Sequence, residues 1–562
     1  MLMHFALHGE TERLALLHRD ADGGLWIELR TLAGRALGEI AADYLPLAAV
    51  WSPDGASLAF GSNDGRLYLY RLGAAAPQLI FADPALQAGF CQWAADGSRL
   101  VFSAYAKANN RPPKIYSLAL DTGHTLQLTH ETGTVDRFPQ WSPSGERVAF
   151  QRQFLDEPEL PTRIYVAEVQ SGRCFPVPNT SDGNSRVGRH CWSPDSASLL
   201  LTVAHPTRTQ VRVIRLQDGA SVWSYESEKL QSGVFSPHGD RILCVDADEL
   251  LWFAYPEGTL LHRLALASRS VVGHSSTGPQ IGFGARATTL YFLGSNACLY
   301  CWDIGGECAP VLESSPPVRP AFTHEAYEVA SQDGRPIPVQ RFIPPKPRAP
   351  AILFVHGGPG EAIDPDDPVM LRLLAEGVEF VCAAYRGSSG HGPEHQAANR
   401  GEYGRADVWD VVAAGRDWQK RTGAGRPLLV AGYSYGGFLT LLALAQADHP
   451  FAGGIAMWTL SGLHRLSLHQ QRAFPVEAEQ LALARVERSP LAQASRMRGP
   501  LLILHGALDT TATTEELQSI QADIVSHGGE CALIVYPDDT HGLWRHRDDL
   551  HAAMLGFLKR YE

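Results

Sequence analysis

The chain has 562 residues, of which 45% are hydrophobic, so it is long enough for two or more domains with their own cores. It carries 48 Lys and Arg against 60 Asp and Glu, which gives a formal net charge of −12. The sequence contains no basic run that could follow a phosphate backbone or an anionic membrane surface. We therefore expect no nucleic-acid partner and no membrane partner.

The N-terminal residues 1–9 lack the basic region, the long apolar core and the small-residue cleavage site of a secretory signal. Nine cysteines, an odd number, fit a reducing compartment better than a disulfide framework, so we expect a cytoplasmic protein. Cys298, Cys301 and Cys308 cluster in the sequence. However, residues 298 and 301 lie in a strand-like run, where side chains three apart point to opposite faces. We expect no metal and no cofactor.

A turn motif recurs through the first 315 residues at spacings of 42, 48, 51 and 43. It consists of an aromatic residue followed by Ser-Pro-Asp-Gly or a close variant. Copies begin at Trp51, Trp93, Trp141, Trp192 and Phe235, with a degenerate copy near Phe283. Pro fixes φ, Asp or Ser bonds the local backbone, and Gly accepts positive φ. Each copy therefore predicts a tight turn between two strands.

Seven pairs of alternating apolar runs accompany these turns. They occupy residues 14–29, 58–72, 100–120, 148–169, 199–216, 242–255 and 290–304. A period of about 45 residues is typical of a β-propeller, whose four-stranded blades bury their faces only against neighbouring blades. We predict an all-β propeller over residues 1–320, with seven blades favoured over six or eight. The first copy lacks the turn motif, so we expect its missing strand to come from elsewhere, such as segment 316–322.

The Pro-rich stretch 314–320 marks the domain boundary, because Pro cannot donate to a ladder and favours extended linkers. Beyond it, buried strand runs alternate with helical stretches. The helical stretches are 403–420, 436–447, 513–526 and 546–560. This alternation requires a parallel sheet covered on both faces. We predict an α/β-hydrolase domain over residues 321–562.

Ser434 lies at the centre of Gly432-Tyr-Ser-Tyr-Gly436, between a buried strand and an apolar helix. This is the context of a nucleophile elbow, in which small residues permit a tight turn that exposes the serine Oγ above the sheet. A serine hydroxyl needs a base within hydrogen-bond reach, and the base needs an anion that orients it. We predict Ser434 as the nucleophile.

In this fold the acid and the base follow the nucleophile in that order. Asp509 follows the strand run 500–506, and His541 follows the run 531–537, so both fall at the carboxyl edge of the sheet. We predict Asp509 as the acid and His541 as the base. The competing residues are His505, a structural residue at a strand end, His546 and His551 in the last helix, and Asp538 and Asp539, interpreted as solvated loop carboxylates.

Acyl transfer also requires hydrogen-bond donors for the oxyanion of the tetrahedral intermediate. One donor is the backbone N–H that follows the nucleophile, here that of Tyr435. The second should come from the loop His356-Gly-Gly-Pro-Gly360, whose glycines allow a close approach of the backbone to substrate. We favour the Gly358 N–H, against the alternative that the loop is a plain tight turn.

The second half resembles the prolyl oligopeptidase family, and most closely its acylaminoacyl peptidase branch. The resemblance rests on the motifs His356-Gly-Gly-Pro359, Tyr385-Arg-Gly-Ser-Ser-Gly-His-Gly392, Gly401-Glu-Tyr-Gly-Arg-Ala-Asp407, Gly432 to Gly437, His505-Gly506 with Asp509, and His541-Gly542. It implies a serine peptidase that cleaves short or N-acylated peptides, with a propeller that caps the active site and excludes folded proteins. The partners would be an oligopeptide or a small acyl substrate, and self-association is plausible.

Many members of this family carry an Arg two residues after the acid, where it can contact a substrate carbonyl or carboxylate. This chain has Thr511 there, which leaves room for a specialised amide, ester or macrocycle as substrate, or for an acyltransfer. The dipeptidyl branch holds a free amino terminus with propeller glutamates. Asp156, Glu157 and Glu159 lie in a suitable insertion, although a solvated acidic loop is the favoured interpretation.

Arg386 lies among glycines in the motif that begins at Tyr385. We expect it to pair with Asp407 or Asp410 and to fix this loop, a structural role rather than a chemical one. Tyr385 ends a strand and is interpreted as a packing residue.

Overall fold

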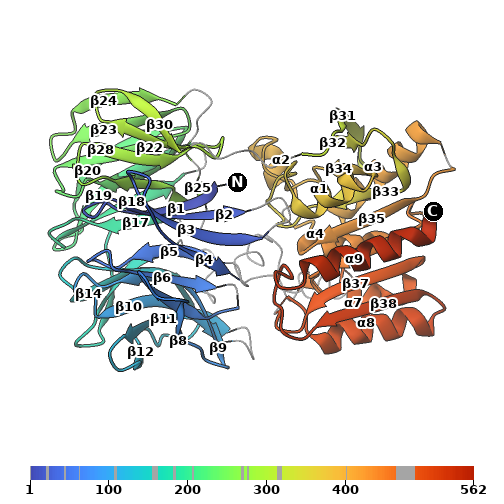
Figure 1. The fold of residues 1–562 in the computed structure, drawn as a ribbon, viewed down its shortest axis with the longest axis horizontal. Coiled ribbons are helices and arrows are strands. Elements are labelled where there is room, and N and C mark those ends of the chain that lie inside the picture. The colour runs from blue at the N-terminus through green and yellow to red at the C-terminus, as the bar shows by residue number, and fades with distance from the viewer. Residues whose placement is uncertain are drawn as a thin grey trace. The chain divides into compact units, whose positions relative to one another are not determined.

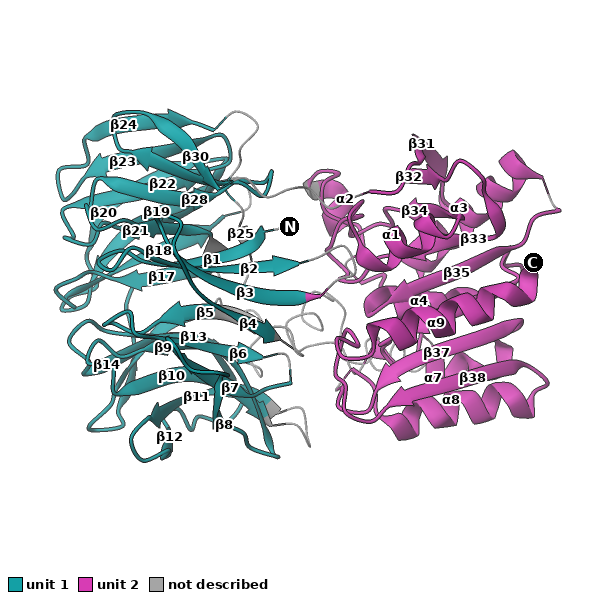
Figure 2. Ribbon diagram, in the orientation of Figure 1, with its two compact units in different colours: residues 1–20, 25–316 teal, residues 21–24, 317–562 magenta. Residues whose placement is uncertain are grey.

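A computed structural model describes the chain except for residues 1, 20–23, 43–45, 63, 107–110, 155–161, 181–184, 206–207, 267–270, 272, 275–277, 313–318, 400, 424, 464–487 and 510. The chain divides into two compact units (Figure 2). The first comprises Met1–Asp20 and Leu25–Pro316, and the second comprises Ala21–Gly24 and Pro317–Glu562. The main division thus falls between residues 316 and 317. The predicted boundary, between residues 320 and 321, lies four residues further along the chain.

The first unit is a seven-bladed β-propeller whose blades are seven four-stranded antiparallel sheets, each built from four consecutive strands (Figure 1). Blades one to four are β1 (Leu2–His8), β2 (Arg13–Arg19), β3 (Leu25–Thr31), β4 (Ala36–Ala42); β5 (Pro46–Trp51), β6 (Ser57–Ser62), β7 (Leu67–Arg71), β8 (Gln78–Phe81); β9 (Leu86–Trp93), β10 (Arg99–Ala106), β11 (Arg111–Ala119), β12 (Thr125–Gln127); and β13 (Thr134–Trp141), β14 (Arg147–Phe154), β15 (Arg163–Glu168), β16 (Cys174–Pro176).

Blades five to seven are β17 (Arg186–Trp192), β18 (Ser198–Ala204), β19 (Thr209–Arg215), β20 (Ser221–Ser227); β21 (Leu230–Phe235), β22 (Arg241–Asp246), β23 (Glu249–Ala254), β24 (Leu260–Ala265); and β27 (Ile281–Phe283), β28 (Thr289–Leu293), β29 (Leu299–Asp303), β30 (Cys308–Leu312). A short ladder pairs β25 (Gly273–His274) with β26 (Gly278–Pro279). The prediction of seven blades is confirmed, and each predicted strand pair is the central pair of a blade.

The recurring turn motif connects the first two strands of a blade, and in three copies its tryptophan also bonds that blade to the one before. Trp51 ends β5, and its indole N–H donates to the Ala6 carbonyl in the preceding blade at 3.1 Å. Within the turn, the Asp54 carboxylate accepts from the Ala56 N–H at 2.9 Å, and Gly55 has a φ of +66°. The indoles of Trp93 and Trp192 donate in the same way to the preceding blade, at 3.1 Å each.

The ring closes by contact between complete blades, so the prediction that segment 316–322 supplies a strand to the first blade is wrong. Blade one takes all four strands from Leu2–Ala42. Its first strand β1 contacts β27 of the last blade. The seam is apolar, because Leu2, Phe5, Leu14 and Leu16 pack with Leu293 and Leu299. A hydrogen bond of 3.3 Å from the Phe5 N–H to Gln280 Oε1 crosses it.

The second unit is built on an eight-stranded sheet with the order β31-β32-β34-β33-β35-β36-β37-β38 (Figure 1). β31 and β32 are antiparallel to their neighbours, and the other pairs are parallel. The strands are β31 (Thr323–Ala330), β32 (Pro336–Ile343), β33 (Arg348–Val355), β34 (Val378–Ala383), β35 (Leu428–Tyr433), β36 (Gly453–Met457), β37 (Pro500–Gly506) and β38 (Glu530–Tyr536). This is the α/β-hydrolase arrangement that the sequence predicts.

Helices cover both faces of this sheet. On one face, α3 (Ala406–Thr422), α4 (Tyr435–Leu444) and α8 (Thr514–Ser526) share a core with the strands, and on the other face α1 (Pro368–Ala375) and α9 (Arg547–Leu558) do so. The shorter elements are α2 (Pro393–Ala397), α7 (Pro490–Gln493), η2 (Ala494–Arg496) and η3 (Lys559–Tyr561). In the described part of the chain, no helix combines the length and the apolar character needed to cross a membrane.

Candidate active site

Ser434 occupies a sharp turn between β35 and α4, as the sequence predicts. Its φ of +56° and ψ of −123° are strained for a residue with a side chain. The flanking residues have to be glycines, because there is no room for a Cβ at either position. A Cβ on Gly432 would lie 2.6 Å from the Val355 carbonyl oxygen, and a Cβ on Gly436 would lie 2.0 Å from the same atom. The close approach of this turn to the end of β33 therefore explains both glycines.

The structure brings Ser434, His541 and Asp509 together at the carboxyl edge of the sheet. The Nε2 atom of His541 lies 3.0 Å from Ser434 Oγ, and its Nδ1 atom lies 2.8 Å from Asp509 Oδ2. In the tautomer with the proton on Nδ1, the ring donates to Asp509 and can accept the serine proton on Nε2. This is the hydrogen-bond order that activates a serine hydroxyl.

Two carboxylates set the protonation of His541. Burial alone would lower the pKa of the imidazole, but Asp509, with a smaller contribution from Glu361, outweighs burial and raises the pKa above its ordinary value of 6.5. For Asp509, burial alone would raise the pKa, but His541 and the hydrogen bonds to the carboxylate lower it. Asp509 is therefore an anion at neutral pH, as an orienting acid must be.

Thr511 holds the other oxygen of the Asp509 carboxylate. Its backbone N–H and its hydroxyl both donate to Oδ1, at 2.8 Å each. The hydroxyl also lies 3.4 Å from His541 Nδ1 and 3.2 Å from the Thr459 carbonyl oxygen. Thr511 thus contacts both the acid and the base. The sequence analysis assigned no role to Thr511, and its neighbour Thr510 lies outside the described residues.

The competing histidines lie elsewhere or have other partners. His505 is fully buried, with its Nε2 atom 3.2 Å from the Ala512 carbonyl oxygen and 3.9 Å from Asp509. His546 pairs with Asp538 at 2.7 Å and with Asp549 at 3.1 Å. In the described part of the chain, neither of these histidines forms a hydrogen bond with Ser434, whereas His541 does.

Asp539 has a structural role that the sequence analysis missed. We expected a solvated carboxylate, and this interpretation is wrong, because only 2% of the residue is exposed. Its oxygens accept from the backbone N–H groups of Thr540 at 2.8 Å, Trp544 at 3.2 Å and Arg545 at 2.9 Å. Asp539 therefore shapes the loop that carries His541. Asp538, in contrast, is exposed and pairs with His546, as a surface carboxylate does.

The two residues proposed as oxyanion donors lie in constrained backbone. Tyr435 is the first residue of α4, so its N–H belongs to the unpaired first turn of a helix. Gly358 follows β33 with a φ of +121°, and a Cβ there would lie 2.5 Å from the Gly360 nitrogen. Their role as donors stays a prediction.

A buried hydrogen-bond network holds the loop that carries Gly358. The Tyr385 hydroxyl donates to the Gly357 carbonyl at 3.0 Å, and His356 Nδ1 lies 2.8 Å from the same oxygen. Because N–H and C=O point in opposite directions across a trans peptide, a fixed Gly357 carbonyl also fixes the direction of the Gly358 N–H. Tyr385, interpreted from sequence as a packing residue, therefore has a polar role as well.

The side chain of Tyr435 is anchored by Asp407. Both residues are fully buried, and the tyrosine hydroxyl donates to Asp407 Oδ2 at 2.5 Å. Burial raises the pKa of Asp407 to about 7.

Arg386 pairs with Asp410 at 2.8 Å and with Asp333 at 2.8 Å. Of the two expected partners of Arg386, the structure thus selects Asp410.

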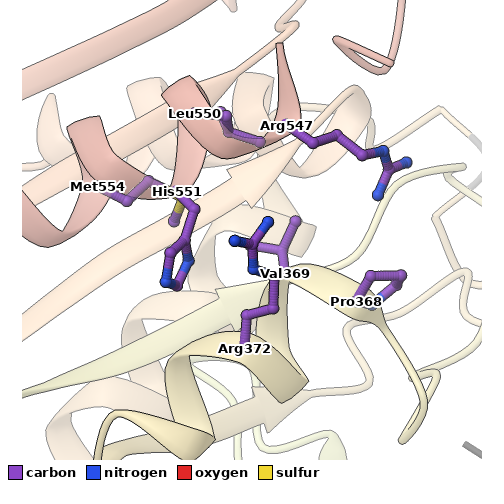
Figure 3. A pocket seen from close by; sticks show the side chains of 7 residues that line it. All are labelled: Pro368, Val369, Arg372, Arg547, Leu550, His551 and Met554. Carbon is purple, nitrogen blue, oxygen red and sulfur yellow. The ribbon is translucent and has the colours of Figure 1, made fainter. Parts of the chain in front are cut away.

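Two small pockets lie in the second unit. One is lined by Phe354, His356, Ile363, Asp364, Asp367, Cys382 and Tyr433. The other lies between α1 and α9 and is lined by Pro368, Val369, Arg372, Arg547, Leu550, His551 and Met554 (Figure 3). Neither of these two pockets is lined by a predicted triad residue. The acidic propeller insertion with Asp156, Glu157 and Glu159 lies outside the described residues.

The fold and the geometry of Ser434, His541 and Asp509 are those of the α/β-hydrolase class of serine hydrolases. Residues 368–562 match the model of the prolyl oligopeptidase family. The chain therefore carries a domain of the prolyl oligopeptidase family, and this domain contains all three residues.

Similar proteins include peptidases. Dipeptidyl-peptidase 5 of Porphyromonas gingivalis is 23% identical over 84% of this chain and 66% of its own length. Acylamino-acid-releasing enzyme 2 of Oryza sativa subsp. japonica is 25% identical over 57% of this chain and 44% of its own length. The chain thus spans two thirds or less of these curated relatives. A crystal structure of puromycin hydrolase is 19% identical, with a TM-score of 0.72, and the match covers 100% of this chain and 94% of the other.

Proposed function

We propose that this protein is a serine peptidase that hydrolyses short or N-acylated peptides through an acyl-enzyme intermediate. The observation that carries the proposal is the hydrogen-bonded series from Ser434 Oγ to His541 Nε2, and from His541 Nδ1 to Asp509 Oδ2, at 3.0 and 2.8 Å. Buried Asp509, which stays ionised, and the strained turn of Ser434 support it, because both are needed for an activated alcohol.

The reaction follows from this geometry. As Ser434 Oγ attacks the carbonyl carbon, its proton moves to His541 Nε2, and the N–H groups of Tyr435 and Gly358 stabilise the negative charge that develops on the carbonyl oxygen. The C–N bond then breaks, and the amine leaves with the proton from His541. In the second half, water gives a proton to His541 as its oxygen attacks the acyl carbon. The ester bond to Oγ then breaks, and Ser434 Oγ takes the proton back from His541 as the acid product leaves.

The peptide substrate is the finer part of the proposal. Support comes from the prolyl oligopeptidase family domain and from relatives named as a dipeptidyl peptidase and an acylamino-acid-releasing enzyme. We also propose, from the family resemblance, that the propeller limits substrates by size. Such a filter would favour oligopeptides over folded proteins, and intact protein substrates should then be cleaved far more slowly than peptides of the same sequence.

The nucleophile is tested by Ser434→Ala. This substitution removes the attacking oxygen and leaves the fold in place, so kcat should fall by about 10⁶-fold with no loss of thermal stability. The rate is measured with acetylated and free aminoacyl chromogenic substrates. Unchanged turnover in the purified variant would overturn the assignment of Ser434.

A second candidate is an esterase, amidase or acyltransferase that uses the same three residues on a small metabolite. It is favoured by Thr511, which occupies the position of the family's substrate-binding arginine and donates to Asp509 instead. Profiling simple esters and amides beside aminoacyl substrates separates the two candidates by kcat/KM. Labelling by a fluorophosphonate probe, with the Ser434→Ala variant as control, distinguishes both from a catalytically inert propeller protein.

A further inference from the structure

Two arginines lie on the first strands of neighbouring propeller blades, Arg137 on β13 and Arg189 on β17. At most blade junctions the first strands of neighbouring blades contact one another, and β13 contacts β17. Arg137 is opposite Gln151 of β14, and the Gln151 side chain donates across to the carbonyl of Gly188, the residue before Arg189. One inter-blade hydrogen bond thus links the backbone positions of the two arginines.

Both arginines lie in irregular backbone. The β13–β14 register shifts between Arg137 and Gln140, and the β17–β18 register shifts between Val187 and His190. Phe138, directly after Arg137, has a φ of +54°, which is strained for an aromatic residue. Bulges of this kind turn side chains out of the ladder and are frequent beside binding sites.

Among the residues that the structure describes, neither guanidinium has a hydrogen-bond or ion-pair partner. The adjacent acid, Asp136, is already used: Arg152 binds it through two hydrogen bonds of 2.7 and 2.9 Å, and Lys114 lies 3.7 Å away. Burial lowers the pKa of Arg189 to about 10 and also lowers that of Arg137. This wall of the propeller is therefore locally rich in desolvated positive charge, within a chain of net charge −12.

His190, the residue after Arg189, does not provide a counter-ion for the two arginines. It is 4% exposed, and burial lowers its pKa to about 4, so the ring is neutral at physiological pH. A partly desolvated cation without a counter-ion is costly, and a bound anion removes that cost. Guanidinium groups match the planar, two-oxygen shape of a carboxylate better than any other side chain does.

We propose that Arg137 and Arg189 form a carboxylate-binding site in the central ring of the propeller, and that its ligand is the C-terminal carboxylate of a short peptide. The choice of a peptide rests on the proposed function, whereas the site itself does not. A site of this kind would select peptides with a free carboxyl end.

The test is isothermal titration calorimetry on full-length protein with Ser434→Ala, so that binding is measured without turnover. The probes are N-acetyl-Ala-Ala with a free carboxylate and its C-terminal amide. We expect the carboxylate form to bind at least about tenfold more tightly than the amide, since a charge-assisted hydrogen bond is lost in the amide. Arg137→Gln and Arg189→Gln should each remove this preference, and lysine at either position should restore part of it.

Arg263→Gln is the matched control, because Arg263 lies on the outer strand β24 with 59% of its side chain exposed. It should leave the preference unchanged, and thermal unfolding checks that each variant is folded. Equal binding of the two probes, or a preference that survives both Gln substitutions, would overturn the site. Binding of inorganic phosphate with the affinity of the peptide carboxylate would overturn the peptide ligand. All of these results are independent of whether Ser434 is the nucleophile.

Discussion

At the residue scale, two carboxylates rather than one raise the pKa of His541. Asp509 accepts its Nδ1 proton, and Glu361, in the loop after β33, adds a second negative charge. Both favour the protonated imidazole. Because a general base must be neutral to accept a proton, these charges raise the pH at which the proposed enzyme becomes active.

This environment predicts the pH profile. As pH falls through the raised pKa of His541, the imidazole takes a proton and kcat/KM declines, so the midpoint of the acid limb should lie above pH 6.5. Glu361→Gln removes one of the charges that raise this pKa and should move the midpoint to lower pH. The control is Glu376→Gln, at the exposed end of α1. A midpoint that does not move in Glu361→Gln would contradict this role.

Thr511 should act as a positioning residue for Asp509. Thr511→Val keeps the size and the backbone N–H but deletes the hydroxyl that donates to Asp509 Oδ1 at 2.8 Å. Loss of a hydrogen bond to a charged group should lower kcat by about 10- to 100-fold and leave KM little changed. Thr511→Ser retains the hydroxyl and should recover most of the rate. Equal rates in the Val and Ser variants would show that the hydroxyl has no such role.

The residues of the candidate site differ in how well sequence could predict them. Ser434, Asp509 and His541 follow strand runs in the order that the fold requires, so position along the chain was enough to select them. Asp407 and Tyr385 act through partners that are distant in sequence, Tyr435 and Gly357. No local pattern reports such contacts, which is why both were given other roles.

At the element scale, the junction of β35 and α4 requires glycine, because the backbone at the end of β33 leaves no room for a Cβ. Gly436→Ala would place a Cβ 2.0 Å from the Val355 carbonyl oxygen, a backbone atom that cannot rotate away. We expect the free energy of unfolding to fall by about 1–3 kcal/mol or more, with loss of activity as Ser434 is displaced.

Gly556→Ala is the matched control for that substitution. Gly556 lies inside α9, and a Cβ there would meet no atom within 4 Å. Alanine should therefore stabilise the protein by about 0.5–1 kcal/mol, because it has the higher helix propensity. Urea unfolding of both variants measures the difference. Equal stability of the two variants would contradict the steric argument.

Most elements could be predicted because their signals are local. The stretch 513–526 contains Thr513 and Glu516, which form a capping box at the start of α8, the helix Thr514–Ser526. α1 was missed because it has only eight residues, too few for a clear period. The first strand of blade one was also missed, since its turn uses Glu12 at a φ of +50° in place of the recurring Pro and Gly. Different turn chemistry therefore hid an ordinary blade.

At the scale of the whole molecule, the propeller ring is closed by the apolar seam between blades one and seven. Leu16→Ala empties a fully buried position at this seam and should destabilise the propeller by about 2–5 kcal/mol. Leu79→Ala, on the outer strand β8 with 46% exposure, should change the stability by less than about 0.5 kcal/mol. Thermal denaturation followed by circular dichroism measures both. Similar midpoints for the two variants would contradict a closing role for the seam.

The contiguity of each blade also sets the order of events during synthesis. Every blade is complete as soon as its own four strands have left the ribosome, so strand pairing can proceed blade by blade as the nascent chain lengthens. The β1 edge of the first blade, however, meets its partners only when β27, β28 and the start of β29 have emerged, near residue 299. Until then the apolar side chains of Leu2, Phe5 and Leu16 lack their contacts with the last blade. A chaperone that shields apolar surface would therefore act mainly in this interval.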